Sequence, residues 1–178
     1  TTDASNAEKH AIHVGTGFDT AFTVSGGSPY DQDYGYEYTA GSSPVDRVNS
    51  AGGGDDAFIN AAVDQQIFDT DNDFIIIGND DQFEVLEVIL ATPSGSNLEL
   101  EFYYSDNTNG TDTGVAGWTQ FYPDDGTAGF TRSGLIDWTA WGAAWDEDDL
   151  AEAGEAITEG YYIAIKRTKN GVVVEPIE

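Results

Sequence analysis

Alternating apolar and polar positions dominate the second half of the chain. The clearest row covers Asn97–Tyr104, where four apolar side chains share one face and Glu99 and Glu101 point to the other. Successive side chains of a β-strand point to opposite faces, so this row predicts a strand with one buried face. Tyr161–Thr168 alternates in the same way, with its isoleucines inward and Lys166 outward. Both segments are therefore predicted to be half-buried strands.

Shorter rows predict further strands. Gln82–Leu90 is apolar on nearly both faces, which is typical of a central strand. Tyr34, Tyr36 and Tyr38 alternate with Gly and Glu, so they predict a short strand with one aromatic face. The other predicted strands are Ala21–Val24, Phe58–Val63, Phe74–Ile77, Trp118–Tyr122, Gly134–Thr139 and Val172–Ile177.

Turn residues separate these rows, and one segment favours a helix. The turns are predicted at Ser25–Pro29, Gly52–Asp56, Pro123–Gly126 and Asn170–Gly171. Asp146 suits the N-cap of a helix that reaches about Ala153, because acidic residues follow it and Gly154 suits the C-terminal cap.

Together the elements predict an all-β fold, an antiparallel β-sandwich that is jelly-roll-like, with long loops and at most one short helix. The length of 178 residues favours a single domain, residues 1–178. We expect its loop-rich part, residues 1–57, to serve assembly or attachment, and residues 58–178 to form the sandwich core.

Charge changes this picture most. The chain has 33 acidic against 6 basic residues, a net charge of −27, and it contains neither Cys nor Met. Such a surface repels itself in dilute salt, whereas molar salt shortens the Debye length from about 10 Å to about 3 Å. We interpret the excess as adaptation to high salt; the alternative is an acidic extracellular or marine protein. Nucleic acid is excluded as a direct partner, because phosphate binding needs clustered Lys and Arg.

Several motifs occur in a fixed order between residues 58 and 178. They are Phe74–Gly78, Gln82–Glu84, Asn97–Tyr104, Gly117–Thr119, Asp125–Thr127, Gly129–Gly134 and Gly160–Ile163. In this order they resemble a β-sandwich module that recurs in structural proteins of tailed viruses and prophages. The chain departs from the module at Gly160–Arg167, where the module has GYWIRIR, and residues 1–60 match none of it. The resemblance implies a virion component and implies no catalytic residues.

A calcium site is the first candidate for chemistry. Asp69, Asp71 and Asp73 place three carboxylates at alternate positions, and calcium prefers such oxygen ligands. An EF-hand loop would also need Gly at its sixth position, which holds Phe74. The alternative is a solvated acidic turn, so Ca²⁺ is the only cofactor that we consider.

Two further groups have both a binding and a structural interpretation. The cluster that contains Lys166, Arg167 and Lys169 either docks on an acidic neighbouring subunit or pairs with carboxylates of its own chain. The tryptophans form either a sugar-stacking platform or part of the core; they are Trp118, Trp138, Trp141 and Trp145. The remaining candidates are His10 and His13, which we interpret as surface residues because an evident third ligand is missing.

The resemblance implies a non-enzymatic virion structural protein, such as a capsid decoration, turret, tail or baseplate accessory protein, and the acidic composition suggests a virus of a halophilic host. The alternative is a carbohydrate-binding or adhesive surface module; a sandwich glycosidase is the weaker third option. The expected partners are other virion proteins, copies of the chain in a symmetric oligomer, and a host-surface glycan. Without a signal peptide or a membrane-spanning stretch in the sequence, we expect synthesis in the host cytoplasm, no membrane insertion, and release in the virion.

Overall fold

The computed structural model describes residues 22–25, 29–31, 34–39, 45–48, 58, 66–96, 98–106, 118–139, 144–147 and 160–170. The strands among these residues form two antiparallel sheets, which turns and irregular segments connect. The prediction of an all-β antiparallel sandwich is therefore confirmed. Among these residues no helix is long and apolar enough to cross a bilayer.

The larger sheet has six strands in the order β4-β3-β5-β11-β7-β8. Their bounds are β3 Tyr34–Tyr38, β4 Val45–Asp46, β5 Phe74–Asn79, β7 Leu98–Tyr104, β8 Thr119–Phe121 and β11 Tyr161–Asn170. The long strand β11 pairs with β5 on one side and with β7 on the other. The sheet is thus built around the last described strand of the chain.

The smaller sheet has five strands in the order β2-β1-β6-β10-β9. Their bounds are β1 Phe22–Ser25, β2 Pro29–Asp31, β6 Val85–Val88, β9 Asp124–Asp125 and β10 Gly134–Asp137. Strand β6 lies between β1 and β10, so the prediction of a central strand within Gln82–Leu90 is confirmed. Strands β1 to β4 belong to the two sheets, so the sandwich also takes in chain from before residue 58.

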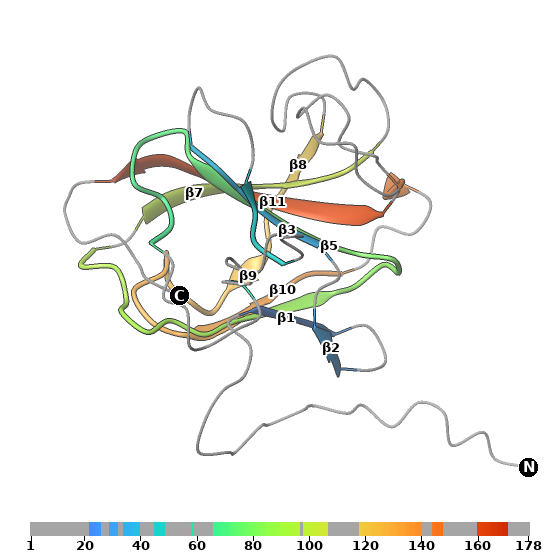
Figure 1. Cartoon of the computed structure of the whole chain (residues 1–178), viewed down its shortest axis with the longest axis horizontal. Coiled ribbons are helices and arrows are strands. Elements are labelled where there is room, and N and C mark those ends of the chain that lie inside the picture. Colours follow the sequence, from blue (N-terminus) through green and yellow to red (C-terminus); the bar gives the residue numbers. More distant parts are fainter. Residues whose placement is uncertain are drawn as a thin grey trace, which may run out of the picture.

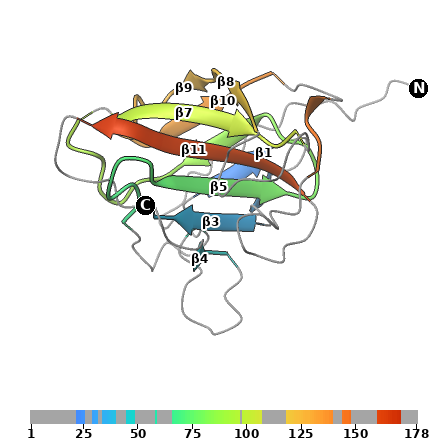
Figure 2. The ribbon, with the colours of Figure 1, turned by 90° about the horizontal axis from the view of Figure 1, so that it is seen from above.

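The two sheets lie in separate layers, as Figure 1 shows, with β11, β7, β5 and β3 in one layer and β1 and β10 in the other. The view from above shows β8, β9 and β10 gathered along one side of the sandwich and β3 and β4 along the opposite side (Figure 2). The main core fills the space between the layers. Its fully buried members include Ile75, Ile77, Leu86, Ile136 and Ile163.

A second apolar cluster covers the other face of the six-stranded sheet. Its buried members are Tyr36, Phe74, Ile76, Tyr162 and Ala164. The rings of Tyr38 and Phe74 stack at 4.3 Å, and Tyr34 and Tyr38 pack against the edge of the cluster. The predicted aromatic face of the strand over Tyr34–Tyr38 is therefore confirmed.

The structure also corrects several boundaries. The segment Pro123–Gly126, which we expected to be a turn, contains the two-residue strand β9 before its turn. Asp146 and Glu147 are not helical, and the rest of the predicted helix lies outside the described residues. Other predictions that lie outside them are the strand over Val172–Ile177, most of Phe58–Val63, the turn at Gly52–Asp56, His10, His13 and Trp141.

Candidate functional site

The chain crosses from one sheet to the other between β8 and β9. Phe121 ends β8 and is buried in the core, and Asp124 begins β9 after only two intervening residues. The first of these, Tyr122, is 87% exposed, the most exposed of the large apolar or aromatic side chains among the described residues. A short crossing therefore holds an aromatic ring out in solvent at the corner of the sandwich.

An open pocket of about 470 Å³ lies at this corner. Its walls come from β8, the crossing, β9 and the end of β10; the lining residues are Phe121, Tyr122, Asp124, Asp137, Trp138 and Thr139. Its volume falls within the range of about 300–1,000 Å³ that is usual for small-molecule sites. Three aromatic residues, two aspartates and one threonine thus line a single open hollow.

The two carboxylates come from directly opposite positions. Asp124 on β9 and Asp137 on β10 are partners in the antiparallel pairing, and both are exposed. Opposite residues in such a pair have Cβ atoms roughly 4.5–5.5 Å apart, and like charges there are destabilising. Within the described part of the chain, no hydrogen bond or ion pair involves either carboxylate. Because both side chains are exposed, their carboxylates can accept hydrogen bonds from solvent or from a ligand.

The aromatic walls are held by the core. Trp138 packs edge-on against Phe121, Phe83 and Trp145, with ring centroids 5.6, 5.5 and 6.4 Å apart. Its backbone N–H also donates to Glu84 O at 3.0 Å, which fixes the chain just after β10. The pocket wall is therefore preorganised, whereas the Tyr122 ring stands free on the rim.

The residue after Asp124 has a structural role. Asp125 accepts hydrogen bonds from the N–H of Thr127 and of Gly129, both at 2.8 Å, and one from the Thr127 hydroxyl. These bonds hold the turn that follows β9. Neighbouring aspartates on one short strand are thus divided between building the turn and facing the pocket.

Titration behaviour near the crossing is set by burial. Burial, the hydrogen bond to Glu101 and the charges of Glu101 and Tyr122 together raise the pKa of Tyr103 on β7 to about 12. The Tyr103 hydroxyl donates to Glu101 Oε2 at 2.5 Å. Burial also raises the pKa of Tyr161, with Glu147, Asp146 and Asp81 adding to the effect. These phenols stay protonated at neutral pH.

The predicted calcium ligands lie on one turn, and two of them bind partners within the protein. Asp73 is buried and accepts from the Thr70 N–H at 2.7 Å and the Thr70 hydroxyl at 3.0 Å. Asp71 pairs with Arg167 at 3.1 Å, and Asp69 is exposed. Among the described residues no group of three or more His, Cys, Asp or Glu has the arrangement of a metal site. The calcium site stays a prediction.

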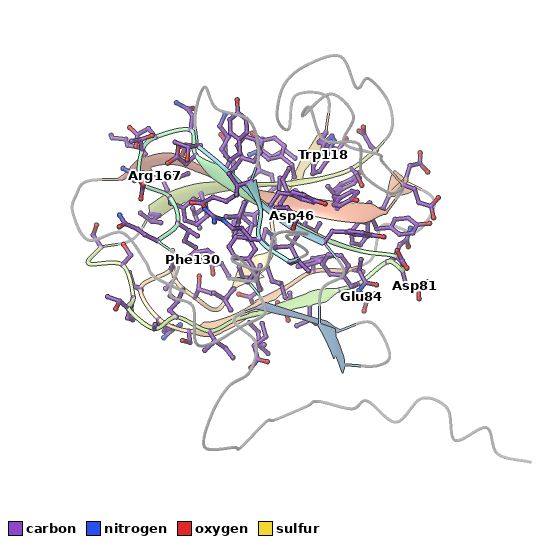
Figure 3. The ribbon with its side chains drawn as sticks, viewed as in Figure 1. Asp46, Asp81, Glu84, Trp118, Phe130 and Arg167 are labelled. Carbon is purple, nitrogen blue, oxygen red and sulfur yellow. The ribbon has the colours of Figure 1, made fainter. Side chains whose placement is uncertain are left out.

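The predicted interface cations each lie beside an acidic residue of the same chain. Lys166 is opposite Glu101 and Lys169 is opposite Glu99 on β7. Arg167 is 6% exposed, and its guanidinium donates to Phe68 O and pairs with Asp71. Because Arg167 lies inside the protein, a docking role for this cluster depends on Lys166 and Lys169. Figure 3 shows Arg167 and Phe130 toward one end of the sandwich, and Asp81 and Glu84 toward the other.

The described tryptophans do not form one exposed platform. Trp145 is 1% exposed, and its indole N–H donates to the buried Ser105 hydroxyl at 3.2 Å. Trp118 is half-buried and stacks on Tyr162 at 6.2 Å. Trp138 alone of these three lines the pocket, so the structural interpretation holds for Trp145 and Trp118.

Sequence reasoning missed Tyr122, Asp124 and Asp137 as site residues. One signal was present, since an aromatic residue directly before a Pro-Asp-Asp-Gly turn is placed where solvent reaches it. Comparisons with protein-family models, with curated proteins and with solved structures find no match to this chain.

Proposed function

We propose that this chain is a non-enzymatic structural component of a virus particle, such as a capsid decoration, turret, tail or baseplate accessory protein, from a virus of a halophilic host. The observation that carries the proposal is the place of the module-like motifs in the fold. Phe74–Gly78, Asn97–Tyr104 and Gly160–Ile163 fall on β5, β7 and the start of β11, three neighbouring strands of one sheet. The resemblance thus concerns the framework of the sandwich.

The turn motif supports the same interpretation. Asp125 and Thr127 bind the backbone of the turn after β9, and Phe130 in the same turn is fully buried. Arg132 closes the turn by donating to Gly126 O at 2.9 Å. The conspicuous polar residues of this motif therefore shape the backbone, which agrees with a framework role for the motif.

The surface supports the halophilic part of the proposal. Ten acidic and two basic side chains are exposed among the described residues. Two of the arginines, Arg47 and Arg167, instead have largely buried guanidinium groups, which pair with Glu37 and Asp71. Withdrawal of cations into the protein leaves an outward field that is strongly negative, which concentrated salt screens.

The test is the composition of particles. Virus particles are purified on a density gradient from a culture of the host that carries this gene, and their proteins are identified by mass spectrometry. We expect the polypeptide in the particle fraction at a fixed ratio to the major capsid protein. Particles that contain the capsid protein but lack this chain would contradict the proposal.

A further inference from the structure

We propose that the corner pocket between β8, β9 and β10 binds a neutral sugar unit of a glycan. This inference goes beyond the structural role proposed above and does not depend on it. The juxtaposition that carries it is one open pocket lined by the exposed Tyr122 and by the cross-strand partners Asp124 and Asp137. Phe121 and Trp138, whose rings are anchored in the core, line the same pocket.

The exposed ring supplies an apolar surface for a ligand. A tyrosine that is 87% exposed gains nothing from the core, yet aromatic side chains bury large areas when a partner covers them. A pyranose ring has one face made mainly of C–H groups, which matches a flat aromatic surface. Tyr122 has two side-chain torsions to order on binding, so this contact costs little conformational entropy.

The carboxylates supply acceptors at a fixed spacing. An ionised carboxylate accepts hydrogen bonds and donates none, and hydroxyl groups are donors that suit it. Asp124 and Asp137 are held opposite one another by the β9–β10 pairing. Two adjacent hydroxyls of a sugar could each donate a hydrogen bond to one of these carboxylates, and no described residue donates to either of them.

Charge limits the class of glycan. Both acidic side chains of the pocket are exposed, and the whole chain carries a net charge of −27. Uronic acids, sialic acids, sulfated sugars and phosphates would bring further negative charge to this site, which costs free energy even in salt. The site therefore selects uncharged saccharides.

The pocket is prepared before any ligand arrives. Phe121 and Trp138 are fixed by edge-on ring contacts in the core, and β9 is fixed by the turn that Asp125 holds. Preorganised walls lower the entropic cost of binding. Leu135, which is 47% exposed on β10 outside the pocket, provides a matched surface position for comparison.

The test is isothermal titration calorimetry of the full chain in molar NaCl. The probes are uncharged oligosaccharides (maltopentaose, cellopentaose, mannopentaose and chitopentaose) and two charged ones (pentagalacturonate and a sialylated lactose). We expect saturable binding of at least one uncharged probe and none of the charged ones. In Tyr122→Ala we expect binding to weaken by at least about tenfold, because the ring supplies much of the contact.

Controls separate loss of the site from loss of the fold. Tyr122→Ala removes an exposed side chain, so its urea midpoint should match that of the wild type. Leu135→Ala should leave binding unchanged, and Asp137→Asn should weaken it. Binding to none of the uncharged probes, a preference for the charged ones, or unchanged binding in Tyr122→Ala would each overturn the proposal. A further titration in dilute salt uses the organic cation tetramethylammonium as the probe. If this cation binds there and none of the uncharged saccharides does, the pocket is a cation site and the proposal is overturned.

Discussion

Asp125 organises a stretch of left-handed backbone in the turn after β9. Three consecutive residues, Ala128, Gly129 and Phe130, have positive φ angles of 52°, 65° and 59°. The left-handed conformation costs a residue with a Cβ atom roughly 1–2 kcal/mol. The bonds from Thr127 and Gly129 to Asp125, together with burial of the Phe130 ring against Phe68, offset that cost. Backbone strain here is therefore a consequence of placing one aromatic ring in the core.

Ala128→Gly should raise the free energy of unfolding by about 0.5–1 kcal/mol. The change removes the left-handed penalty of roughly 1–2 kcal/mol and adds a glycine entropy cost of roughly 0.5–1 kcal/mol. Ala164→Gly is the matched control, since Ala164 is fully buried in β11 without a positive φ angle, and it should lower stability. Urea unfolding in molar NaCl measures both; a loss of stability in both variants would contradict the prediction.

Gly126 and Gly134 in the same motif are explained by the close approach of two backbone segments. A Cβ atom on Gly126 would lie 2.5 Å from Leu135 O, and one on Gly134 would lie 2.6 Å from Gly126 O. Such contacts are shorter than a carbon and an oxygen atom tolerate. Gly126 and Gly134 are thus required because the backbones of β9 and β10 approach closely at the turn that joins them.

At the scale of elements, a largely buried ion pair ties Arg47, directly after the edge strand β4, to Glu37 on β3. Glu37 on β3 is 8% exposed and accepts from Arg47 Nη2 at 2.6 Å and from Arg47 Nε at 3.0 Å. Burial raises the pKa of Glu37 above its ordinary value of 4.5, against the opposing hydrogen bond and charge of Arg47. The folded protein therefore holds a proton on Glu37 more strongly than the unfolded chain does.

Glu37→Gln should change how stability depends on pH. Because the folded pKa is raised, Glu37 contributes stability that is fully present below pH 4.5 and is lost as pH rises through the folded pKa. The variant lacks this loss, so its stability relative to the wild type should rise over that interval. Urea unfolding from about pH 4 to about pH 7 in molar salt measures the difference.

A control and a contrary outcome make this prediction specific. Glu99→Gln removes one exposed carboxylate from β7 and controls for the change in net charge. A stability difference between Glu37→Gln and the wild type that stays constant with pH would show that Glu37 is ionised equally in the folded and unfolded states.

Sequence patterns predicted the elements well where alternation was long. β7 and β11 could be located because apolar residues recur at every second position over most of their length. The strands β2, β4 and β9 span two or three residues, too few for a periodic signal. Alternation along β11 also places the Arg167 side chain on the inward face and that of Lys166 on the outward face. This pattern indicates that Arg167 is buried and needs a partner inside the protein.

The site was harder to predict than the fold because it depends on register. Asp124 and Asp137 are 13 positions apart, and only the pairing of β9 with β10 makes them opposite. Tyr122 lies near them because a short crossing joins two different sheets. Neither the register nor the crossing leaves a periodic trace in the chain, so the pocket could be found only from the structure.

At the scale of the whole molecule, charge should govern stability. We expect the urea midpoint to rise as NaCl increases from dilute to molar, because screening removes repulsion among the exposed carboxylates. A variant with Asp81→Asn, Glu99→Gln and Glu147→Gln should show a weaker salt dependence, because all three side chains are exposed. Equal salt dependence in the two proteins would assign the effect to ordinary salting-out.

The central place of β11 has a consequence for biosynthesis. β5 and β7 both take hydrogen bonds from β11, which begins at Tyr161, more than 50 residues after β7 ends at Tyr104. Until the ribosome has made β11, β5 and β7 each have one edge whose backbone groups are unpaired. Contacts of such long sequence separation slow folding and expose strand edges to other nascent chains. The large repulsive charge of this chain would then act during translation as well, by keeping unfinished copies apart.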